Sequence, residues 1–399
     1  MKKAVSIVGS GPSALMLAAQ LNEQKFDVTV YERNFAPGRK FLVAGDGGFN
    51  LTHSENTDRF ILRYTPASFF QDLISSFNNN DLRGWLKSIG IETYVGTSKR
   101  VFPVKGIKPI EVLNAILDEL KRKNVQIKTQ HTWKGWNEKN ELLFENNKTG
   151  ITVQTDLAVF ALGGASWSKT GSDGRWTSIF EQKKIQIIPF QASNCAYAIN
   201  WNPAFLASAE GKSLKNISVT CNGKVKDGEL VITHFGIEGG AIYALSPEIR
   251  EQLNQQKTAT VYIDLKPVFS ADELKNKLTS KGNRSVTKQL EDELNFNTVH
   301  IALLKFVLSK EEFTNTGVLA EKIKKLPIVI TAAAPVEEAI STAGGISLSE
   351  IDEHFQLKKL KNNFVIGEML DWDAPTGGYL LQGCFSMGSR LAEFLNATE

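Results

Sequence analysis

The 399-residue sequence predicts an α/β fold in which the first and last parts of the chain form one domain, interrupted by an insert of different character. Three observations lead to this prediction. The chain opens with a strand–turn–helix–strand pattern that is complete within about 30 residues. From Pro189 the pattern changes to β-strands separated by Asn/Gly turns and then to helices, and after Pro335 the α/β character returns.

The first strand, Ala4–Val8, runs into the sequence Gly-Ser-Gly-Pro-Ser-Ala, which fits the pattern Gly-x-Gly-x-x-Gly/Ala. The first glycine permits a tight turn, the second lets the backbone approach a pyrophosphate, and the alanine allows close packing of helix on strand. A diphosphate would then lie on the N-terminal amides of the following helix. The residues expected at this dinucleotide site are Gly9, Gly11, Pro12, Ser13 and Ala14.

An acidic residue, Glu32, ends the second strand, Asp27–Tyr31, 21 residues after Gly11. An acid at this distance accepts hydrogen bonds from the ribose hydroxyls of a bound dinucleotide, and Arg33 follows it directly. The alternative is an ordinary strand–helix turn with a surface glutamate. The motif alone does not separate FAD from NAD.

A second constellation lies near the C-terminus, where Gly367–Asp371 follows the short strand Phe364–Ile366 and Thr376–Gln382 opens an apolar helix. In an α/β sheet both segments return to the crevice at the strand ends. Asp371 is a candidate for a ribityl hydroxyl or a phosphate-bound water. The helix amides at Gly378–Leu381 would stabilise negative charge at flavin N1 and O2. The alternative is a Gly-rich loop in which Thr376 caps the helix.

The patterns between these motifs predict the remaining elements. Strands are expected at 125–129, 142–145, 151–154, 157–162, 217–221, 229–233 and 258–265. Helices are expected near 69–77, 81–90, 110–124, 271–278, 286–295, 297–308, 318–325 and 379–395.

Six segments occur in an order that is similar to one known family: the N-terminal fingerprint, 37–41, 162–166, 233–237, 343–346 and 367–382. Together they resemble the bacterial BaiN/YhiN-like flavoproteins, which are NAD(P)/FAD-dependent oxidoreductases also called the aminoacetone oxidase family. The resemblance covers essentially the whole chain. Its most specific parts are the Gly-Arg-Lys segment and Gly-Glu-x-Leu-Asp…Thr-Gly-Gly-Tyr.

The resemblance implies a glutathione-reductase-type, Rossmann-like FAD-binding domain interrupted by an insert with a β-barrel part and a helical part. We expect residues 1–190 and 335–399 to form the discontinuous FAD domain, 191–270 and 326–334 the β-rich insert domain, and 271–325 its helical part. The insert would cover the flavin and supply much of the substrate pocket.

By matching positions, the resemblance also implies the FAD contacts. The contacts carried over from the family are Ser13, Glu32, Arg39, Lys40, Trp133 (through its main chain), Glu368, Asp371, Gly378 and Leu381. The motifs themselves add Gly9, Gly11, Pro12, Ala14, Arg33, Gly163, Gly377 and Tyr379. Arg39 and Lys40 would neutralise the diphosphate, and the alternative for both is a solvated loop charge.

One segment departs from the family pattern. Most members carry Gly-Gly-Gly-Arg-Cys-Asn after the Gly-Arg-Lys motif, whereas this chain has Gly-Asp-Gly-Gly-Phe-Asn at 45–50, which indicates a distinct subfamily. His234 in the insert is a candidate to protonate a reduced substrate. Asp46 and Asn50 are further catalytic candidates, because in this fold such a loop can pass close to the isoalloxazine, where its glycines leave room for a flat substrate. The alternatives are a flexible connection and a structural histidine; His53 is a weaker candidate of the same kind.

Composition limits the partners. The net charge of +3 is too small for a nucleic-acid-binding surface, and residues 185–209, the longest uncharged stretch, contain two prolines, so neither a nucleic acid nor membrane insertion is expected. Cys195, Cys221 and Cys384 have no disulfide or metal-ligand spacing, so we expect no metal, no thiol relay and a cytoplasmic location. The tryptophans Trp133, Trp136, Trp167 and Trp372 are interpreted as core or interface aromatics.

The sequence therefore predicts an FAD-dependent oxidoreductase that transfers a hydride through flavin N5 to or from a small molecule. NAD(P)H is a candidate electron donor, although no second Gly-x-Gly-x-x-Gly follows a predicted strand. Two alternatives stay open: a flavoprotein that acts in RNA modification, and a protein that holds FAD without turnover. The substrate, donor, direction and oligomeric state are not predicted.

Overall fold

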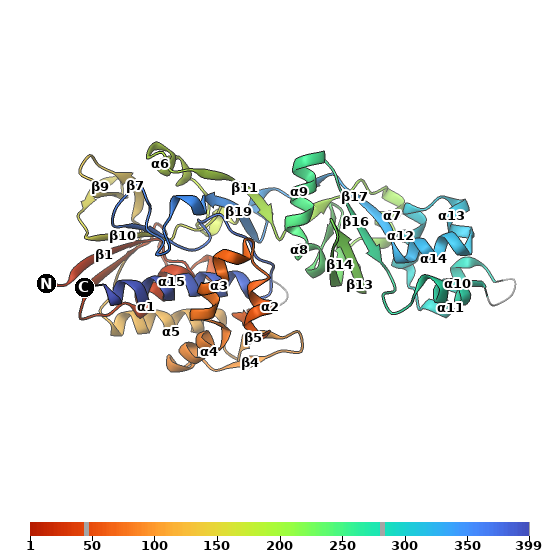
Figure 1. The fold of residues 1–399 in the computed structure, drawn as a ribbon, viewed down its shortest axis with the longest axis horizontal. Helices are drawn as coiled ribbons and strands as arrows, with labels where there is room; N and C mark the ends of the chain where they lie inside the picture. Colours follow the sequence, from red (N-terminus) through yellow and green to blue (C-terminus); the bar gives the residue numbers. More distant parts are fainter. Residues whose placement is uncertain (44–47, 280–283, 399) are drawn as a thin grey trace. The chain divides into compact units, whose positions relative to one another are not determined.

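The computed structural model describes residues 1–43, 48–279 and 284–398. The chain divides into two compact units, coloured along the sequence in Figure 1. Unit 1 consists of Met1–Gln191 and Ile340–Glu399, and unit 2 of Ala192–Ala339. Each unit has its own hydrophobic core. The chain thus leaves unit 1 once, builds unit 2 and returns.

Unit 1 is built on a five-stranded sheet in which every neighbouring pair is parallel. The strand order is β20 (Asn363–Val365), β10 (Leu157–Phe160), β1 (Lys3–Val8), β2 (Phe26–Tyr31) and β6 (Gln126–Lys128). Because β20 pairs with β10, both separated parts of the chain contribute to one sheet. The predicted α/β class is confirmed.

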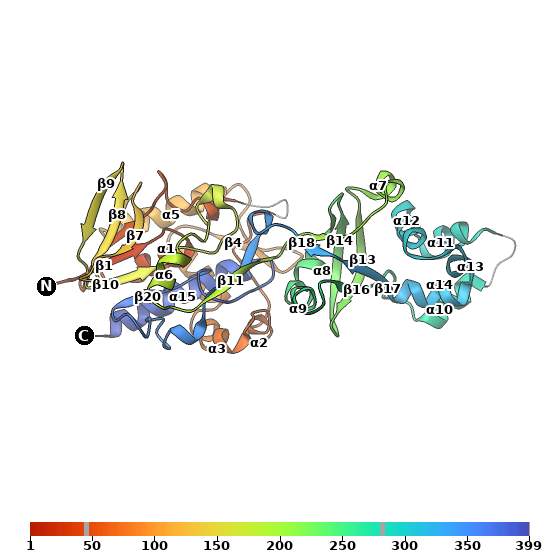
Figure 2. The ribbon, with the colours of Figure 1, turned by 90° about the horizontal axis from the view of Figure 1, so that it is seen from above.

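Three helices cover one side of this sheet: α1 (Pro12–Gln20), α5 (Pro109–Arg122) and α15 (Tyr379–Ala397) (Figure 1). α1 and α15 lie side by side in both views (Figures 1 and 2). Gly388 makes this approach possible, since a Cβ atom there would overlap the main-chain oxygen of Ser13. The two helices therefore touch backbone to backbone.

A three-stranded antiparallel sheet packs on the other side through aromatic rings: Phe144 stacks on Tyr31 at 4.3 Å between ring centroids, and Trp133 lies 4.7 Å from Phe160. This sheet consists of β7 (Thr132–Trp136), β8 (Leu142–Asn146) and β9 (Thr149–Val153). The remaining described elements of unit 1 are β3 (Thr52–His53), β4 (Thr93–Val95), β5 (Arg100–Pro103), β19 (Ser341–Ile346), α2 (Thr57–Ile61), α3 (Ala67–Ser76), α4 (Asn79–Ser88), α6 (Thr177–Gln182) and three short 3₁₀ turns. Strand β11 (Ile187–Ser193) begins in unit 1 and ends in unit 2, which contains one further 3₁₀ turn (Val336–Glu338).

Unit 2 combines a seven-stranded antiparallel sheet with helices (Figure 2). Its outermost strands, β17 and β18, are separated only by Thr331 in the chain, so one continuous segment pairs with β16 and with β12 and joins the two ends of the strand order. The strands, in spatial order, are β17 (Leu326–Ile330), β16 (Ala259–Asp264), β13 (Ser213–Cys221), β14 (Lys224–Ile232), β15 (Gly236–Glu238), β12 (Tyr197–Ala198) and β18 (Ala332–Ala333).

Side-chain caps fix where several helices of unit 2 begin. Asn202, Ser285, Asn297, Ser309 and Asn315 each accept a hydrogen bond from a first-turn amide, which satisfies a donor that has no partner within the helix. The helices are α7 (Pro203–Ala209), α8 (Gly240–Tyr243), α9 (Ser246–Gln256), α10 (Ala271–Thr279), α11 (Val286–Leu294), α12 (Thr298–Val307), α13 (Lys310–Thr314) and α14 (Thr316–Lys324).

Within the described ranges, none of the helices is both long and apolar enough to cross a lipid bilayer.

The contact between α1 and α15 makes a testable prediction. Gly388→Ala would force a methyl group against backbone atoms of α1, which have little room to move, so we expect the free energy of unfolding to fall by about 1–3 kcal/mol. Gly84→Ala is the matched control: it lies inside α4, a Cβ there would meet nothing within 4 Å, and we expect a gain of about 0.5–1 kcal/mol. Urea unfolding of both variants measures the difference; equal stabilities would contradict the close approach.

Candidate functional site

The turn between β1 and α1 contains two glycines: Gly9 is closely packed against the protein, whereas Gly11 leaves room for a ligand. Gly9 has a positive φ of 101°, and a Cβ there would overlap the main-chain oxygen of Ala161, so the position requires glycine. At Gly11 a Cβ would meet no atom within 4 Å. Pro12 starts the helix and Ala14 is buried. The open side of the turn therefore faces the first helix amides, where a diphosphate binds in this motif.

Ser13, in the first turn of α1, has a buried hydroxyl without a hydrogen-bond partner in the described part of the chain. Gly367, which follows β20, approaches it closely, since a Cβ at Gly367 would lie 2.6 Å from Ser13 Oγ. Buried polar atoms in native proteins are almost always paired. The unpaired hydroxyl beside the glycine turn therefore indicates a binding site for a polar ligand.

Glu32 is 8% exposed at the end of β2 and is held from two directions. Its Oε1 accepts hydrogen bonds from Asn34 N (2.8 Å) and Asn34 Nδ2 (2.7 Å), and its Oε2 accepts one from the hydroxyl of Ser10. Ser10 Oγ in turn accepts from Gly38 N at 3.2 Å. A carboxylate has about four acceptor positions, so Glu32 is fixed in place and retains capacity for a ligand hydroxyl.

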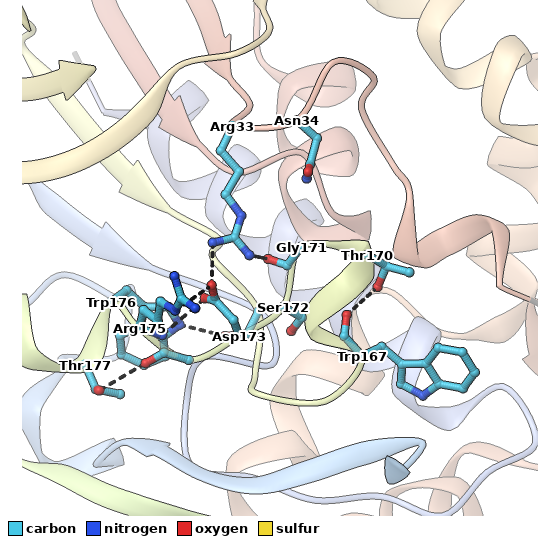
Figure 3. Close-up of polar contacts among 12 residues, drawn as sticks. Arg33, Asn34, Trp167, Thr170, Gly171, Ser172, Asp173, Arg175, Trp176 and Thr177 are labelled. Atoms are coloured by element: carbon cyan, nitrogen blue, oxygen red, sulfur yellow. Dashed lines mark hydrogen bonds and ion pairs between the residues drawn. The ribbon is translucent and has the colours of Figure 1, made fainter. Parts of the chain in front are cut away.

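Arg33 points towards Gly171 and Asp173 (Figure 3). Its Nη1 lies 2.8 Å from Asp173 Oδ2, and its Nη2 donates to the main-chain oxygen of Gly171. The guanidinium is therefore committed to the loop that follows Gly163, whose own oxygen accepts from Trp176 Nε1 at 3.0 Å. The resulting ion pair ties the segment after β2 to this loop.

The side chain of Arg39, by contrast, has only weak contacts: its Cζ lies 5.1 Å from the ring centroid of Phe35, and its Nη1 lies 3.5 Å from Asn34 Oδ1. It is half-buried on the segment next to Glu32. The guanidinium is thus available for a further partner.

Lys40 and Glu368 form an ion pair that joins segments far apart in the chain. Lys40 Nζ donates to Glu368 Oε2 and to Ser166 Oγ, both at 2.9 Å. Glu368 Oε1 accepts from Thr342 N at 3.3 Å. Asp371 lies on the same segment, and its Oδ1 accepts from the amide of Gly344 at 3.1 Å. Four segments of unit 1 thus meet around one lysine.

The N-terminus of α15 also packs backbone to backbone. Gly377 and Gly378 both have a positive φ, 114° and 100°, and a Cβ at Gly378 would lie 2.5 Å from the Cα of Thr52. The alternative in which Thr376 caps this helix is wrong: the N-cap is Gly378, without a side-chain cap. First-turn amides, including that of Leu381, lack partners within the helix and give this end a partial positive charge.

Sequence reasoning missed a polar cluster behind this helix end. Tyr379 donates its hydroxyl to Glu55 Oε1 at 2.6 Å, and Arg63 binds both oxygens of Glu55 at 2.8–2.9 Å. Burial raises the pKa of Glu55, but the hydrogen bonds from Arg63 and Tyr379 outweigh it and hold the pKa below its usual range. His53 stacks on Tyr379 at 5.1 Å, and burial lowers the pKa of its imidazole. His53, Glu55 and Arg63 are close in the chain, but Tyr379 lies more than 300 residues further on, so no local pattern indicates the complete cluster.

The three catalytic candidates lie in different parts of the chain, and each is described by itself. Asp46 lies outside the described residues. Asn50 is half-buried just before β3 and donates its main-chain amide to Gly48 O at 3.1 Å. His234 belongs to unit 2, where its side chain is 81% exposed and its Nδ1 lies 3.8 Å from Glu210.

Trp133 is buried in β7, and its ring packs against Trp136 and Phe160 in the core of unit 1. Trp372 is likewise buried, 4.9 Å from the ring of Phe70. Both are core aromatics, which is one of the two interpretations given above. Trp167 is 39% exposed, so it is not a core aromatic, and its interpretation as an interface aromatic stays a prediction.

Comparison with known proteins agrees with these features. The family model described as "HI0933-like protein Rossmann domain" matches residues 3–394. The chain is 26% identical to the ribosomal RNA dihydrouridine synthase of Haemophilus influenzae over 95% of each chain, and 22% identical to the 3-dehydro-bile acid delta(4,6)-reductase of Clostridium scindens over 96% of this chain and 97% of the other. Among solved structures, 3-ketosteroid-delta4-(5alpha)-dehydrogenase from Rhodococcus jostii shares the fold, with a TM-score of 0.52, 10% identity and coverage of 100% and 97%. The chain therefore belongs to the HI0933-like Rossmann family, the family of FAD-dependent oxidoreductases that its motifs resemble.

Proposed function

We propose that unit 1 binds one FAD and that the protein moves a hydride through flavin N5 to or from a carbon–carbon bond next to a carbonyl group. The observation that supports FAD most directly is the β1–α1 turn. It combines an open side at Gly11, an orphaned hydroxyl on Ser13 and a fixed carboxylate on Glu32. These are the groups that a diphosphate and a ribose need.

Each candidate residue has a role in this proposal. The turn Gly9–Ala14 would receive the diphosphate, Arg39 would neutralise it, and Glu32 would bind the ribose. Glu368 and Asp371, held by Lys40 and by backbone amides, would accept hydrogen bonds from ribityl hydroxyls or from a phosphate-bound water. Further contacts would come from Arg33, Trp133 and Gly163 through their main chains, and from Gly377, Gly378, Tyr379 and Leu381.

Bound FAD would supply hydride exchange at N5. The chain's part in the chemistry is electrostatic: the amides at the start of α15 would stabilise negative charge at the pyrimidine edge of the flavin. A thiol relay has no support, because burial raises the pKa of Cys384 to about 12 and that of Cys221 to about 11, so both stay protonated. NAD(P)H is the proposed donor in the reductive direction.

The substrate class follows from what the two relatives' names share. Making dihydrouridine and reducing a delta(4,6) 3-oxo steroid both add hydrogen across a ring C=C bond that is conjugated to a carbonyl. The hydride goes to the β-carbon and a proton to the α-carbon, while the donor is oxidised. We therefore propose a small cyclic enone as substrate, with His234 and Asp46 as the candidates to deliver the proton and Asn50 as a candidate polar contact in the same site.

A second candidate function is the reduction of uridine within ribosomal RNA. The relative from Haemophilus influenzae favours it, because it is similar over 95% of each chain. The net charge of +3 weighs against it, because RNA binding depends on a basic surface.

Purified protein should carry one FAD per chain, and Gly11→Val should abolish FAD binding. The valine side chain would occupy the space proposed for the diphosphate. Its Cβ would lie more than 4 Å from other protein atoms, so we expect the variant to fold. Gly150→Val is the control: it lies on β9, has equally open surroundings, and should keep its FAD. Flavin absorbance and circular dichroism measure both properties. A parent protein that refuses added FAD would contradict the proposal.

Ser13→Ala should separate cofactor binding from stability. Because the hydroxyl makes no hydrogen bond of ordinary length and angle with the described residues, its removal should leave the unfolding midpoint of the apoprotein unchanged or raised. The affinity for FAD should fall roughly 2- to 10-fold with the lost hydrogen bond. Ser88→Ala, which removes a hydroxyl bonded to Trp85 O, should leave FAD affinity unchanged. A destabilised Ser13→Ala apoprotein with parental FAD affinity would show that the hydroxyl is structural.

The two substrate classes can be separated in one assay. Dithionite-reduced holoprotein should be reoxidised under anaerobic conditions by 2-cyclohexenone or 4-androstene-3,17-dione, at a rate proportional to enone concentration. Ribosomal RNA transcribed in vitro should not reoxidise it. Dihydrouridine detected in that RNA by mass spectrometry, without reoxidation by either enone, would favour the second candidate.

A further inference from the structure

Trp167 differs from the six other tryptophans in the chain. In the described residues every other tryptophan has an aromatic ring within 6.4 Å, whereas no ring contact involves Trp167. It is also the one tryptophan among the exposed large hydrophobic residues, at 39%. An indole that neither packs in the core nor pairs with a ring is unusual, since burying an aromatic ring is favourable.

The backbone of Trp167 is left-handed, with φ 60° and ψ 53°. Bulky side chains rarely adopt this conformation, and most other non-glycine residues that do so here are Asn or Lys. The other aromatic example, Phe355, is buried and in ring contact with Phe69. Strained conformations persist where the surroundings fix them, and they cluster at functional sites.

Polar contacts hold the backbone around Trp167 and leave its indole free (Figure 3). Thr170 donates both its amide and its hydroxyl to Trp167 O, each at 2.8 Å. Two residues of the same loop, Gly171 and Asp173, are bound by Arg33. In Figure 3 the indole points away from these contacts. The loop is thus anchored to the segment after β2 while it presents an unpaired ring.

Ser166, which precedes Trp167 in the chain, connects it to the Lys40–Glu368 ion pair. Ser166 Oγ lies 2.9 Å from Lys40 Nζ and 3.4 Å from the main-chain oxygen of Ile340. The side chain of Ile340 is itself 39% exposed. Two exposed apolar residues therefore lie next to a serine that contacts a proposed cofactor-binding lysine.

From this arrangement we infer that Trp167 forms the stacking surface for the flat ring of the substrate. This inference rests on the proposed function, which supplies a cyclic enone as the planar ligand. An indole offers a broad apolar face to such a ring. The left-handed backbone turns that face out of the core, so Trp167 is a specificity-determining residue rather than a core aromatic.

The test uses FAD-loaded parent and variant proteins titrated with two probes, uridine and 4-androstene-3,17-dione, with the visible flavin spectrum as readout. At least one probe should perturb the parent spectrum. Trp167→Ala should weaken binding of that probe at least 10-fold, and Trp167→Phe, which keeps a flat ring, should stay within 3-fold of the parent. The probe that responds identifies the nucleoside or the steroid class.

Trp167→Gly separates recognition from structure, because glycine adopts the left-handed conformation freely. Its thermal midpoint should equal or exceed that of the parent, while probe binding falls as in Trp167→Ala. The control is Tyr94→Ala, which removes another exposed ring, 47% exposed on β4, and should bind the probe as the parent does.

Parental probe affinity in Trp167→Ala overturns the inference alone, and so does a parent spectrum that neither probe perturbs while FAD is bound. A parent protein that takes up no FAD overturns both this inference and the proposed function.

Discussion

Close backbone contact between the start and the end of the chain is the constraint on which unit 1 depends. Four glycines, Gly9, Gly367, Gly378 and Gly388, each occupy a position where a Cβ would collide with a neighbouring segment. Three of these contacts join residues from the last 40 positions to residues before position 60. Protein interiors are close-packed, so a larger side chain at these four positions would push the neighbouring segments apart. The glycines therefore determine where the strand ends and helix ends meet.

The acidic residues of the candidate site are all held in place by hydrogen bonds from the protein backbone. Glu32, Glu368 and Asp371 each accept a hydrogen bond from a backbone amide, and side chains also bind Glu32 and Glu368. A carboxylate fixed in this way loses little further freedom when it binds a ligand hydroxyl, so its orientation is set before the ligand arrives. Arg39 is different, because its contacts are weak and its guanidinium group can change position to meet a ligand.

Much of the fold could be predicted because its signals are local. The turn at Gly9–Ala14 is short and specific, and the apolar strands and amphipathic helices have clear periods. β7 was missed because its inward positions hold Trp133 and Gly135, and a glycine in a bulge does not look like a strand residue. α9 was missed because its surface is largely polar and Ile249 is its one buried apolar residue. The cluster of Glu55, Arg63 and Tyr379 depends on tertiary contact alone, and the exposure of Trp167 reflects a backbone conformation that composition does not encode.

The position of β20 at the edge of the parallel sheet governs the order in which the protein is assembled during translation. Its partner strand β10 leaves the ribosome about 200 residues earlier, and all of unit 2 is synthesised in between. The sheet therefore waits with one edge open, and α1 waits without the helix that covers it, until the last strand and α15 emerge. Unit 2 has its own core and can complete its folding during that interval. The nascent chain thus exposes an unpaired strand edge and an apolar helix face for the whole of that time, which makes this stage of synthesis the one most open to aggregation and to chaperone binding.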